Sequence, residues 1–501
     1  MSRETNTNTQ MGLFDTSADH AQKRNGVPGV EKYEGALLLS AIGDALGWPT
    51  EFLTPDVKRN PPFQLPVRSF VSWKKRVGGK WWGYIELIEP GQYSDDTQLT
   101  LAVARSVSEK CRFEPERFAY EGLPLWLHYE RGGGRSIKAA ARSLIRRKGD
   151  WLHNFYKQND IDYRNAGANG AAMRNLPIAL VHVNDEAALV RDSFFNAVIT
   201  HGHPRGILGA ILFGLAARHV LADRDGQARS TLKEYLIDAI SSIGRFMVGD
   251  DRVEQWIMSW EKGKAKDKGF FKGLFQQTKE EAQRYLGAVS EFTQKEPREY
   301  YRFVGALDQT TKGSGISTVC VAIYLYLQSG KEPATALYTA ANMFGSDTDT
   351  ISVFLGALLG AEHGIQAIPT HLMEQIQDRD YLLKIARRLH AIAKGELYEH
   401  AASQKPIDRR EAYLRILAWE IGLHEMFWDA LDEGSIVVHP TIGRGKITRK
   451  DVREIPREGY VAKLIHVAFD CGQTCVFHSR VENNLKVSES LAQDLEKALK
   501  E

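Results

Sequence analysis

Three short segments of this chain bring carboxylates and hydroxyls together in numbers that suggest chemistry. The second and third lie where a polar turn leads into an apolar, helix-like run, the place where Asp, Ser and Thr usually cap a helix. One cap requires one such side chain, whereas these turns supply four or five oxygen-bearing side chains each. The segments are GDALGWPTEF with Asp44 and Glu51, YSDDTQLTLAVA with Ser94, Asp95 and Asp96, and FGSDTDTISVFLGALLGA with Asp347, Asp349 and Thr350.

If these turns converge in the fold, their carboxylates repel one another and raise one another's pKa values. A hard divalent cation removes that conflict, and carboxylates, hydroxyls and water are the ligands that Mg²⁺ and Mn²⁺ prefer. The three segments contain no His or Cys, which disfavours zinc or copper. On spacing alone, a metal site and plain helix capping by surface acids are equally open.

Three further segments offer weaker signals for anion binding. AGANGAAMRNLPIAL places Gly167, Asn169 and Gly170 directly before an apolar helix, where backbone N–H groups can approach a phosphate. ERGGGRS carries three glycines around Gly133, and THGHP carries His201. Each segment by itself is more typical of an ordinary turn or a structural histidine than of a ligand site.

Helices must position these motifs, because apolar residues at three- and four-residue spacing dominate the chain from about 31 to 397. Small residues in runs such as ILGAILFGLAARHVL allow helices to pack closely. We expect a mainly α fold, no strand of note before residue 434, and a solvated surface insertion at 261–275. The expected helices are 35–46, 97–109, 171–182, 188–200, 207–222, 231–247, 279–293, 317–329, 334–343, 350–362 and 381–394.

The pattern changes towards the end of the chain. A helical run at 409–432 precedes short β-branched segments separated by Gly and polar turns, which predict a small β-barrel. The expected organisation is a disordered lead-in at 1–30, a main helical domain at 31–400, a connecting segment at 401–433, a barrel at 434–485 and a terminal helix at 486–501.

Composition limits the remaining possibilities. The 501 residues carry 65 basic and 63 acidic side chains, so no global field draws the protein to nucleic acid or a membrane. Four cysteines are too few for a disulfide scaffold, and metal binding by Cys471 and Cys475 stays open because structural zinc usually needs four ligands. The polar first 28 residues lack the apolar stretch of a signal peptide, and the longest apolar run, 351–361, is too short to span a bilayer. We expect a cytoplasmic protein without a membrane partner.

Together and in their order, the motifs resemble those of the ADP-ribosylglycohydrolase family over residues 31–395. The resemblance implies an all-α bundle with two Mg²⁺ ions in a cleft, Mn²⁺ being an alternative, although Ser94 stands where the family usually has Thr. The implied metal ligands are Ser94, Asp95, Asp96, Asp347, Asp349 and Thr350; the catalytic residues are Glu51, Asp96 and Asp349; and the ADP-ribose-binding residues are Asp44, Gly133, Asn169, Gly170, Met173 and His201.

The implied activity is metal-dependent hydrolysis at the anomeric carbon that joins ADP-ribose to a modified protein or other macromolecule. Glu51 or an aspartate of the cluster would act as general base, and the transition state would have oxocarbenium character. A catalytically silent ADP-ribose-binding protein is the alternative, although all six metal-triplet residues are present. The sequence leaves the acceptor bond open: arginine, serine, a nucleic-acid base or a small molecule. It leaves the oligomeric state open too.

The C-terminal segment IVVHPTIGRGKIT, followed by YVAKLIHVAFD, resembles SH3/Tudor-like modules. Residues 434–480 carry eight Lys and Arg against four Asp and Glu. A module that docks a protein or nucleic-acid partner and a purely stabilising accessory barrel both fit this pattern. If docking is its role, removing the module should spare turnover of a small substrate.

Overall fold

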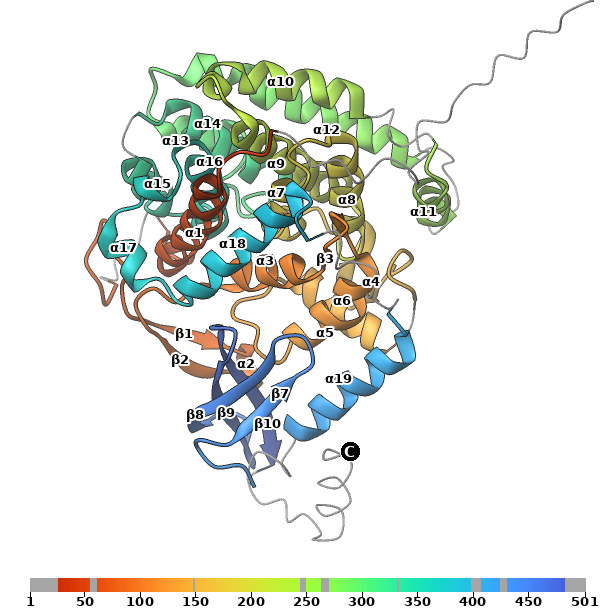
Figure 1. Ribbon diagram of the computed structural model, residues 1–501, viewed down its shortest axis with the longest axis vertical. Helices are drawn as coiled ribbons and strands as arrows, with labels where there is room; N and C mark the ends of the chain where they lie inside the picture. Colours follow the sequence, from red (N-terminus) through yellow and green to blue (C-terminus); the bar gives the residue numbers. More distant parts are fainter. Residues whose placement is uncertain are drawn as a thin grey trace, which may run out of the picture.

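The computed structural model describes residues 26–54, 61–146, 149–243, 249–262, 270–330, 333–397, 407–423 and 430–482. Within these ranges the protein is mainly helical, which confirms the predicted fold class, and its C-terminal part is a β-sheet (Figure 1). Most of the predicted lead-in at 1–30 and the predicted terminal helix at 486–501 lie outside the described residues.

The elements follow one another with short connections. The helices are α1 (Val30–Gly47), α2 (Gly79–Trp82), α3 (Asp95–Arg105), α4 (Pro115–Arg117), α5 (Leu123–Trp126), α6 (Arg135–Ile145), α7 (Leu176–Val181), α8 (Glu186–Val198), α9 (Pro204–Ala222), α10 (Ala228–Ser242), α11 (Asp251–Lys262), α12 (Phe270–Gly287), α13 (Pro297–Phe303), α14 (Gly315–Gln328), α15 (Pro333–Ala341), α16 (Thr348–His363), α17 (Thr370–Gln375), α18 (Arg379–Lys394) and α19 (Arg409–Leu423). The strands are β1 (Trp73–Val77), β2 (Tyr84–Ile88), β3 (Val107–Ser108), β4 (Arg112–Phe113), β5 (Lys157–Gln158), β6 (Ile161–Asp162), β7 (Ile436–His439), β8 (Gly443–Glu454), β9 (Tyr460–Phe469) and β10 (Thr474–Glu482).

Helices α1 and α16 pack against each other through glycines, with their backbones in direct contact. A Cβ added to Gly43 would lie 2.2 Å from the carbonyl oxygen of Ser352, and one added to Gly356 would lie 2.2 Å from that of Leu39. No side chain fits at such a distance, so glycine is required on both helices. The pairing sets the C-terminal end of α1 against the N-terminal end of α16, near Gly47, where two of the acidic motifs lie.

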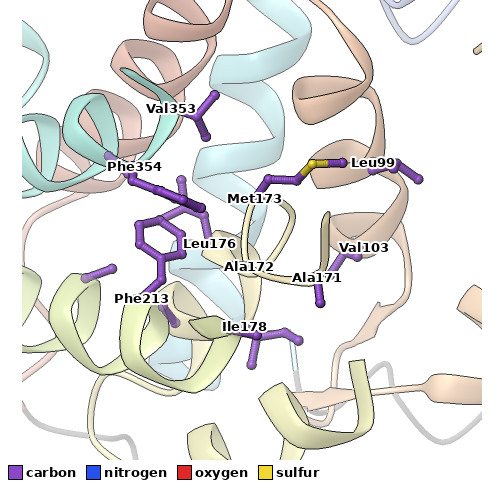
Figure 2. Packing of buried hydrophobic residues seen from close by; sticks show 14 of the residues in the cluster. Leu99, Val103, Ala171, Ala172, Met173, Leu176, Ile178, Phe213, Val353 and Phe354 are labelled. Carbon is purple, nitrogen blue, oxygen red and sulfur yellow. The ribbon is translucent and has the colours of Figure 1, made fainter. Parts of the chain in front are cut away.

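Apolar side chains from α3, α7, α9 and α16 meet behind the motif-bearing helix ends (Figure 2). Leu99 of α3 and Met173, which precedes α7, lie in this core, and the rings of Phe213 and Phe354 pack with centroids 4.5 Å apart. Helix α9 is long and apolar enough to cross a membrane by length and composition alone, but 78% of its apolar stretch is buried inside the molecule. It is the type of helix that forms the centre of a bundle.

The C-terminal sheet corrects the prediction of a closed barrel at 434–485. Four antiparallel strands lie in the order β10-β9-β8-β7, and within the described residues the two edge strands do not pair with each other. The register shifts between Ile447 and Arg449, where β8 bulges against β9. The sheet is therefore open, and helix α19 runs beside it (Figure 1).

A β-hairpin before residue 434 was not expected from the sequence. Strands β1 and β2 pair antiparallel with alternating burial, and Val77 and Tyr84 of this hairpin pack against Ala462, Leu464 and Val476 of the C-terminal sheet. The hairpin thus joins the sheet to the helical part of the molecule (Figure 1).

The solvated surface insertion predicted at 261–275 is wrong for the part that the structure describes. Helix α12 begins at Phe270, and Phe271 and Phe275 are buried. The ring of Phe271 packs against Trp256 and Trp260 of α11 with centroids 5.0 and 5.2 Å apart. The aromatic residues between the lysines therefore anchor a second helical layer instead of standing in solvent.

Candidate metal centre

Three acidic side chains from distant parts of the sequence meet where α1 ends and α16 begins. Glu51, Asp347 and Asp349 each offer a carboxylate oxygen, and these oxygens lie within 4.8 Å of one another. Charges this close repel strongly unless a cation or protons lie between them. The convergence expected from the motifs is therefore present.

The first triplet is held by the buried carboxylate of Asp44. Ser94 donates its backbone N–H to both oxygens of Asp44 at 3.1 Å, and Thr97 donates its N–H at 3.0 Å and its hydroxyl at 2.6 Å. The Ser94 hydroxyl accepts the N–H of Asp96 and caps α3. Because Asp44 is fully buried and occupied by these donors, its contacts fix the turn that presents Asp95 and Asp96.

The second triplet does not follow the simple capping explanation. Asp347 is the N-cap residue of α16, yet its side chain makes no capping hydrogen bond. Its carboxylate instead accepts from the side-chain amide of Asn169 at 2.9 Å. Asp349 accepts the N–H of Thr350 at 2.9 Å, and Thr350 lies near enough to Asp96 to favour the ionised carboxylate there. The turn therefore directs its carboxylates towards the first triplet.

Glu51 follows a short 3₁₀ turn, Trp48–Thr50, that closes the end of α1. The Thr50 hydroxyl donates to the carbonyl oxygen of Gly47 at 2.8 Å and contacts the hydroxyl of Thr348 at 3.1 Å. Thr348 also donates its hydroxyl to Gly47 at 2.8 Å. Two threonines thus tie the Glu51 turn directly to the first residue of α16.

The site disfavours ionised carboxylates when no cation is present. Burial, followed by repulsion from Asp347, raises the pKa of Glu51 from 4.5 to about 7. Burial is the largest cause at Asp95, Asp96 and Asp349 too, and neighbouring carboxylates add to it, so their pKa values lie well above the usual range.

The donor set fits a hard divalent cation. Within the described residues, the Oδ2 atom of Asp96 is buried without a hydrogen-bond partner. A buried carboxylate oxygen without a donor is costly, and a cation satisfies it. The residues available around it are carboxylates and hydroxyls from the two triplets, with Glu51 beside them, which are the ligands that Mg²⁺ and Mn²⁺ prefer.

The loop predicted to bind ADP-ribose lies against the second triplet. Asn169 donates to Asp347 and receives its own position from Gly313, whose carbonyl oxygen accepts the Asn169 N–H at 2.9 Å. A Cβ at Gly170 would lie 3.0 Å from the ring of His201, so this glycine lets the loop rest on the histidine. His201 is buried, and burial followed by the charge of Arg174 lowers its pKa to about 3, which keeps the imidazole neutral.

Gly133 and Met173 lie further from the metal centre. Gly133 packs against Trp126 and donates its N–H to Glu130 at 2.9 Å, whereas the adjacent Gly132 faces the centre, since a Cβ there would lie 3.1 Å from Asp95. Met173 is buried in the core (Figure 2), and its carbonyl oxygen accepts the Thr100 hydroxyl. The structure thus directs Gly132 towards the centre and places Met173 behind it.

Two lysines beside the centre were missed in the sequence. Lys75 of β1 is buried, and its ammonium lies 4.8 Å from the ring centre of Trp48 and 4.4 Å from that of Phe52. Lys75 and Lys312 both lower the pKa of Glu51 against the effect of burial. Neither lysine stands in a recognisable motif; only the neighbouring glycines of KGSG at 312–315 gave a signal.

Similarity to known proteins is extensive over the helical part. A model of the ADP-ribosylglycohydrolase family matches residues 28–398. The chain is 32% identical to the ADP-ribosyl-[dinitrogen reductase] glycohydrolase of Rhodospirillum rubrum over 194 residues, 39% of this chain and 59% of that protein, which is less than two thirds of its length. It is 26% identical to the ADP-ribosylhydrolase ARH3 of Danio rerio over 382 residues, 72% of this chain and 90% of that protein. A solved structure, an ADP-ribosylglycohydrolase-related protein complex, aligns with a TM-score of 0.47 and 19% identity over 73% of this chain and 98% of that chain.

The matched region contains Glu51, both acidic turns and the Asn169 loop, and it stops before the C-terminal sheet. The similarity of the motifs to the family is thus confirmed, whereas the comparisons say nothing about an SH3-like module. The family model covers well over half of the chain, and the acidic motifs that it includes meet in the structure. The chain therefore belongs to the ADP-ribosylglycohydrolase family and is an enzyme of the glycosyl hydrolase type.

Proposed function

We propose that this enzyme removes ADP-ribose from a modified macromolecule in a metal-dependent hydrolysis of the glycosidic bond. The observation that carries the proposal is the meeting of Glu51, Asp347 and Asp349, with a buried, unpartnered oxygen of Asp96 in the adjoining triplet. A cluster with these ligands suits one or two Mg²⁺ or Mn²⁺ ions. The named activities of the relatives, which act on ADP-ribosylated substrates, support the same reaction.

The ligands for the ions would come from the two triplets. These are Ser94, Asp95, Asp96, Asp347, Asp349 and Thr350. A bound metal supplies Lewis acidity, which orients ribose hydroxyls and makes a bound water a better nucleophile. Asp44 keeps the first triplet in place through its hydrogen bonds to Ser94 and Thr97, so its role is to position the ligands.

Glu51 is the proposed general base. It lies on a turn at the edge of the cluster and is less buried than Asp349, so an approaching water can reach it. Its pKa of about 7 in the metal-free protein is near the working pH, where a carboxylate removes a proton from water most effectively. The proton lost by water passes to Glu51, and the oxygen attacks the anomeric carbon as the acceptor leaves.

The other side of the cleft would hold ADP-ribose. The Asn169–Gly170 loop offers an amide and exposed backbone beside Asp347, and glycine allows a ligand to approach closely. His201 supports this loop from below as a neutral imidazole, so it adds no charge to the pocket floor. Gly132 and Lys75 border the opposite side next to Asp95.

A panel of substrates tests the proposal. Purified protein is incubated with arginine-linked, serine-linked and nucleic-acid-linked ADP-ribose, with Mg²⁺ or with a chelator, and released ADP-ribose is measured. We expect release from at least one substrate that requires the metal, and none from the matched Asp349→Asn variant. Binding of ADP-ribose without release from any substrate would identify the protein as a silent ADP-ribose-binding relative and overturn the proposal.

A further inference from the structure

The C-terminal sheet reaches the metal-binding turn through one residue, Thr474, at the start of β10. Its backbone N–H donates to both carboxylate oxygens of Asp378 at 3.1 and 3.0 Å, and its hydroxyl donates to one of them at 2.8 Å. The side-chain amide of Gln377 donates to the Thr474 hydroxyl at 2.9 Å. Thr474 therefore holds two consecutive residues of the segment between α17 and α18.

Asp378 passes this contact to the first metal triplet. The hydroxyl of Tyr93 donates to Asp378 at 2.6 Å, and Tyr93 is the residue immediately before Ser94. Tyr93 is almost fully buried, so its ring has little freedom to move independently of its backbone. The position of the Tyr93 hydroxyl thus determines where the triplet begins.

Gln377 passes the contact to the same triplet by a second route. Arg131 donates to the Gln377 side-chain oxygen at 3.3 Å, and the carbonyl oxygen of Arg131 accepts the N–H of Asp95 at 2.9 Å. Arg131 also pairs with the buried Glu86 of the hairpin at 3.3 Å. Both residues that flank the triplet in space are therefore fixed by neighbours of Thr474.

The same turn of the sheet also contacts the far end of α3, the helix that the triplet begins. Arg105, the last residue of α3, donates to the side chain of Gln473 at 2.9 Å. The β9–β10 turn therefore holds both ends of α3, directly at Arg105 and through Asp378 and Gln377 at its start. A docking module that merely recruits a partner has no need of such contacts.

We propose that the C-terminal sheet positions the first metal triplet, with Thr474, Asp378 and Gln377 acting as positioning residues for Asp95 and Asp96. The proposal rests on the metal-dependent function proposed above, and it goes beyond the family, whose match ends before the sheet. Partners behind the metal ligands orient them, and losing such a partner typically weakens metal binding by about 10- to 100-fold.

Substitutions at Thr474 test this in the full-length protein. Thr474→Val removes the hydroxyl bonds to Asp378 and Gln377 but keeps the backbone donor and the branched shape. Thr474→Ser keeps the hydroxyl. Mn²⁺ binding is measured from the free-ion electron paramagnetic resonance signal, together with the Mg²⁺ dependence of turnover. We expect about tenfold weaker Mn²⁺ binding for Thr474→Val and near wild-type binding for Thr474→Ser.

Asp470→Asn is the matched control, because Asp470 precedes the same turn and its carboxylate pairs only with the exposed Arg444 among the printed contacts of the described chain. Asp378→Asn serves as a second variant, since asparagine tolerates the left-handed backbone at this position, φ 57°. We expect it to weaken Mn²⁺ binding at least as much as Thr474→Val does. Far-UV circular dichroism and thermal unfolding with chelator present show whether each variant is folded.

Wild-type Mn²⁺ affinity in folded Thr474→Val and Asp378→Asn would overturn the proposal, as would a wild-type protein that binds no Mn²⁺. Equal weakening in Asp470→Asn would overturn it too, because the effect would then be general to the turn. If Mn²⁺ binding weakens as expected but no ADP-ribosylated substrate is hydrolysed by the wild type, the positioning role stands and the proposed function falls.

Discussion

Glu51→Gln should reverse its effect on stability when metal is added. In the metal-free protein the pKa of Glu51 is raised from 4.5 to about 7, mainly by burial. A raised carboxyl pKa means that the folded protein binds the proton more tightly than the unfolded chain. Below pH 4.5 both states are protonated and nothing is lost, whereas above pH 7 both are ionised and the folded state bears the full penalty.

The size of the effect follows from the two pKa values. One pH unit corresponds to about 1.4 kcal/mol, so ionised Glu51 destabilises the metal-free protein by about 3 kcal/mol at pH 8 but by less than about 1 kcal/mol at pH 5. For a chain of this length the unfolding entropy near 60 °C is about 1 kcal/mol/K, which converts the larger figure to about 3 °C in Tm. A neutral glutamine carries no such penalty.

Thermal unfolding with a chelator at pH 5 and pH 8 measures this directly. Glu51→Gln should unfold about 3 °C higher than the wild type at pH 8 and within about 1 °C of it at pH 5. With Mg²⁺ at saturation the advantage should vanish, and turnover should fall by about 10²–10⁴-fold while ADP-ribose affinity is kept. Equal Tm values for variant and wild type at pH 8 with chelator would refute the electrostatic reasoning, and lost affinity with unchanged turnover would refute the catalytic assignment.

Three other outcomes follow from the geometry of the centre. Asp96→Asn and Asp349→Asn should abolish turnover and most Mn²⁺ binding without changing the far-UV circular dichroism; wild-type rates in both would disprove the site. Gly47→Ala should destabilise the protein by roughly 1–3 kcal/mol and reduce turnover, because the added Cβ would lie 2.6 Å from the Cα of Asp349. Its control is Gly273→Ala in α12, where nothing lies within 4 Å, and a similar loss in both would contradict the packing argument. Lys75→Met should tighten Mg²⁺ binding several-fold in a calorimetric titration, since an ammonium that repels the ion is removed; weaker binding would show that Lys75 supports the centre instead.

The acidic motifs and the mainly helical fold could be predicted from the sequence because both depend on local patterns. Helix periodicity is set over a few turns, and a helix start is marked by residues within one turn of it. The excess of oxygen-bearing side chains at Ser94 and at Asp347 therefore pointed to something beyond capping. The structure bears this out at Asp347, whose side chain caps nothing.

The hairpin at β1 and β2 escaped prediction for an equally local reason. Its inward face carries Lys75 and Glu86 between apolar residues, so the hydrophobic alternation of a half-buried strand is broken in the letters although the burial alternates. Lys75 is buried because it lies among aromatic rings beside the acidic centre, and Glu86 because Arg131 pairs with it. Neither partner lies in the same segment of the sequence.

The sequence by itself determined which side chains could bind a metal, since motif spacing and residue type are written locally. The tertiary structure alone decided that Glu51 meets Asp347 and that Thr474 supports the turn of Asp95. These contacts join residues hundreds of positions apart, and they exist because glycines let α1 and α16 touch and because the open sheet packs on the hairpin. Distant contacts depend on the packing of whole elements, which no local pattern encodes.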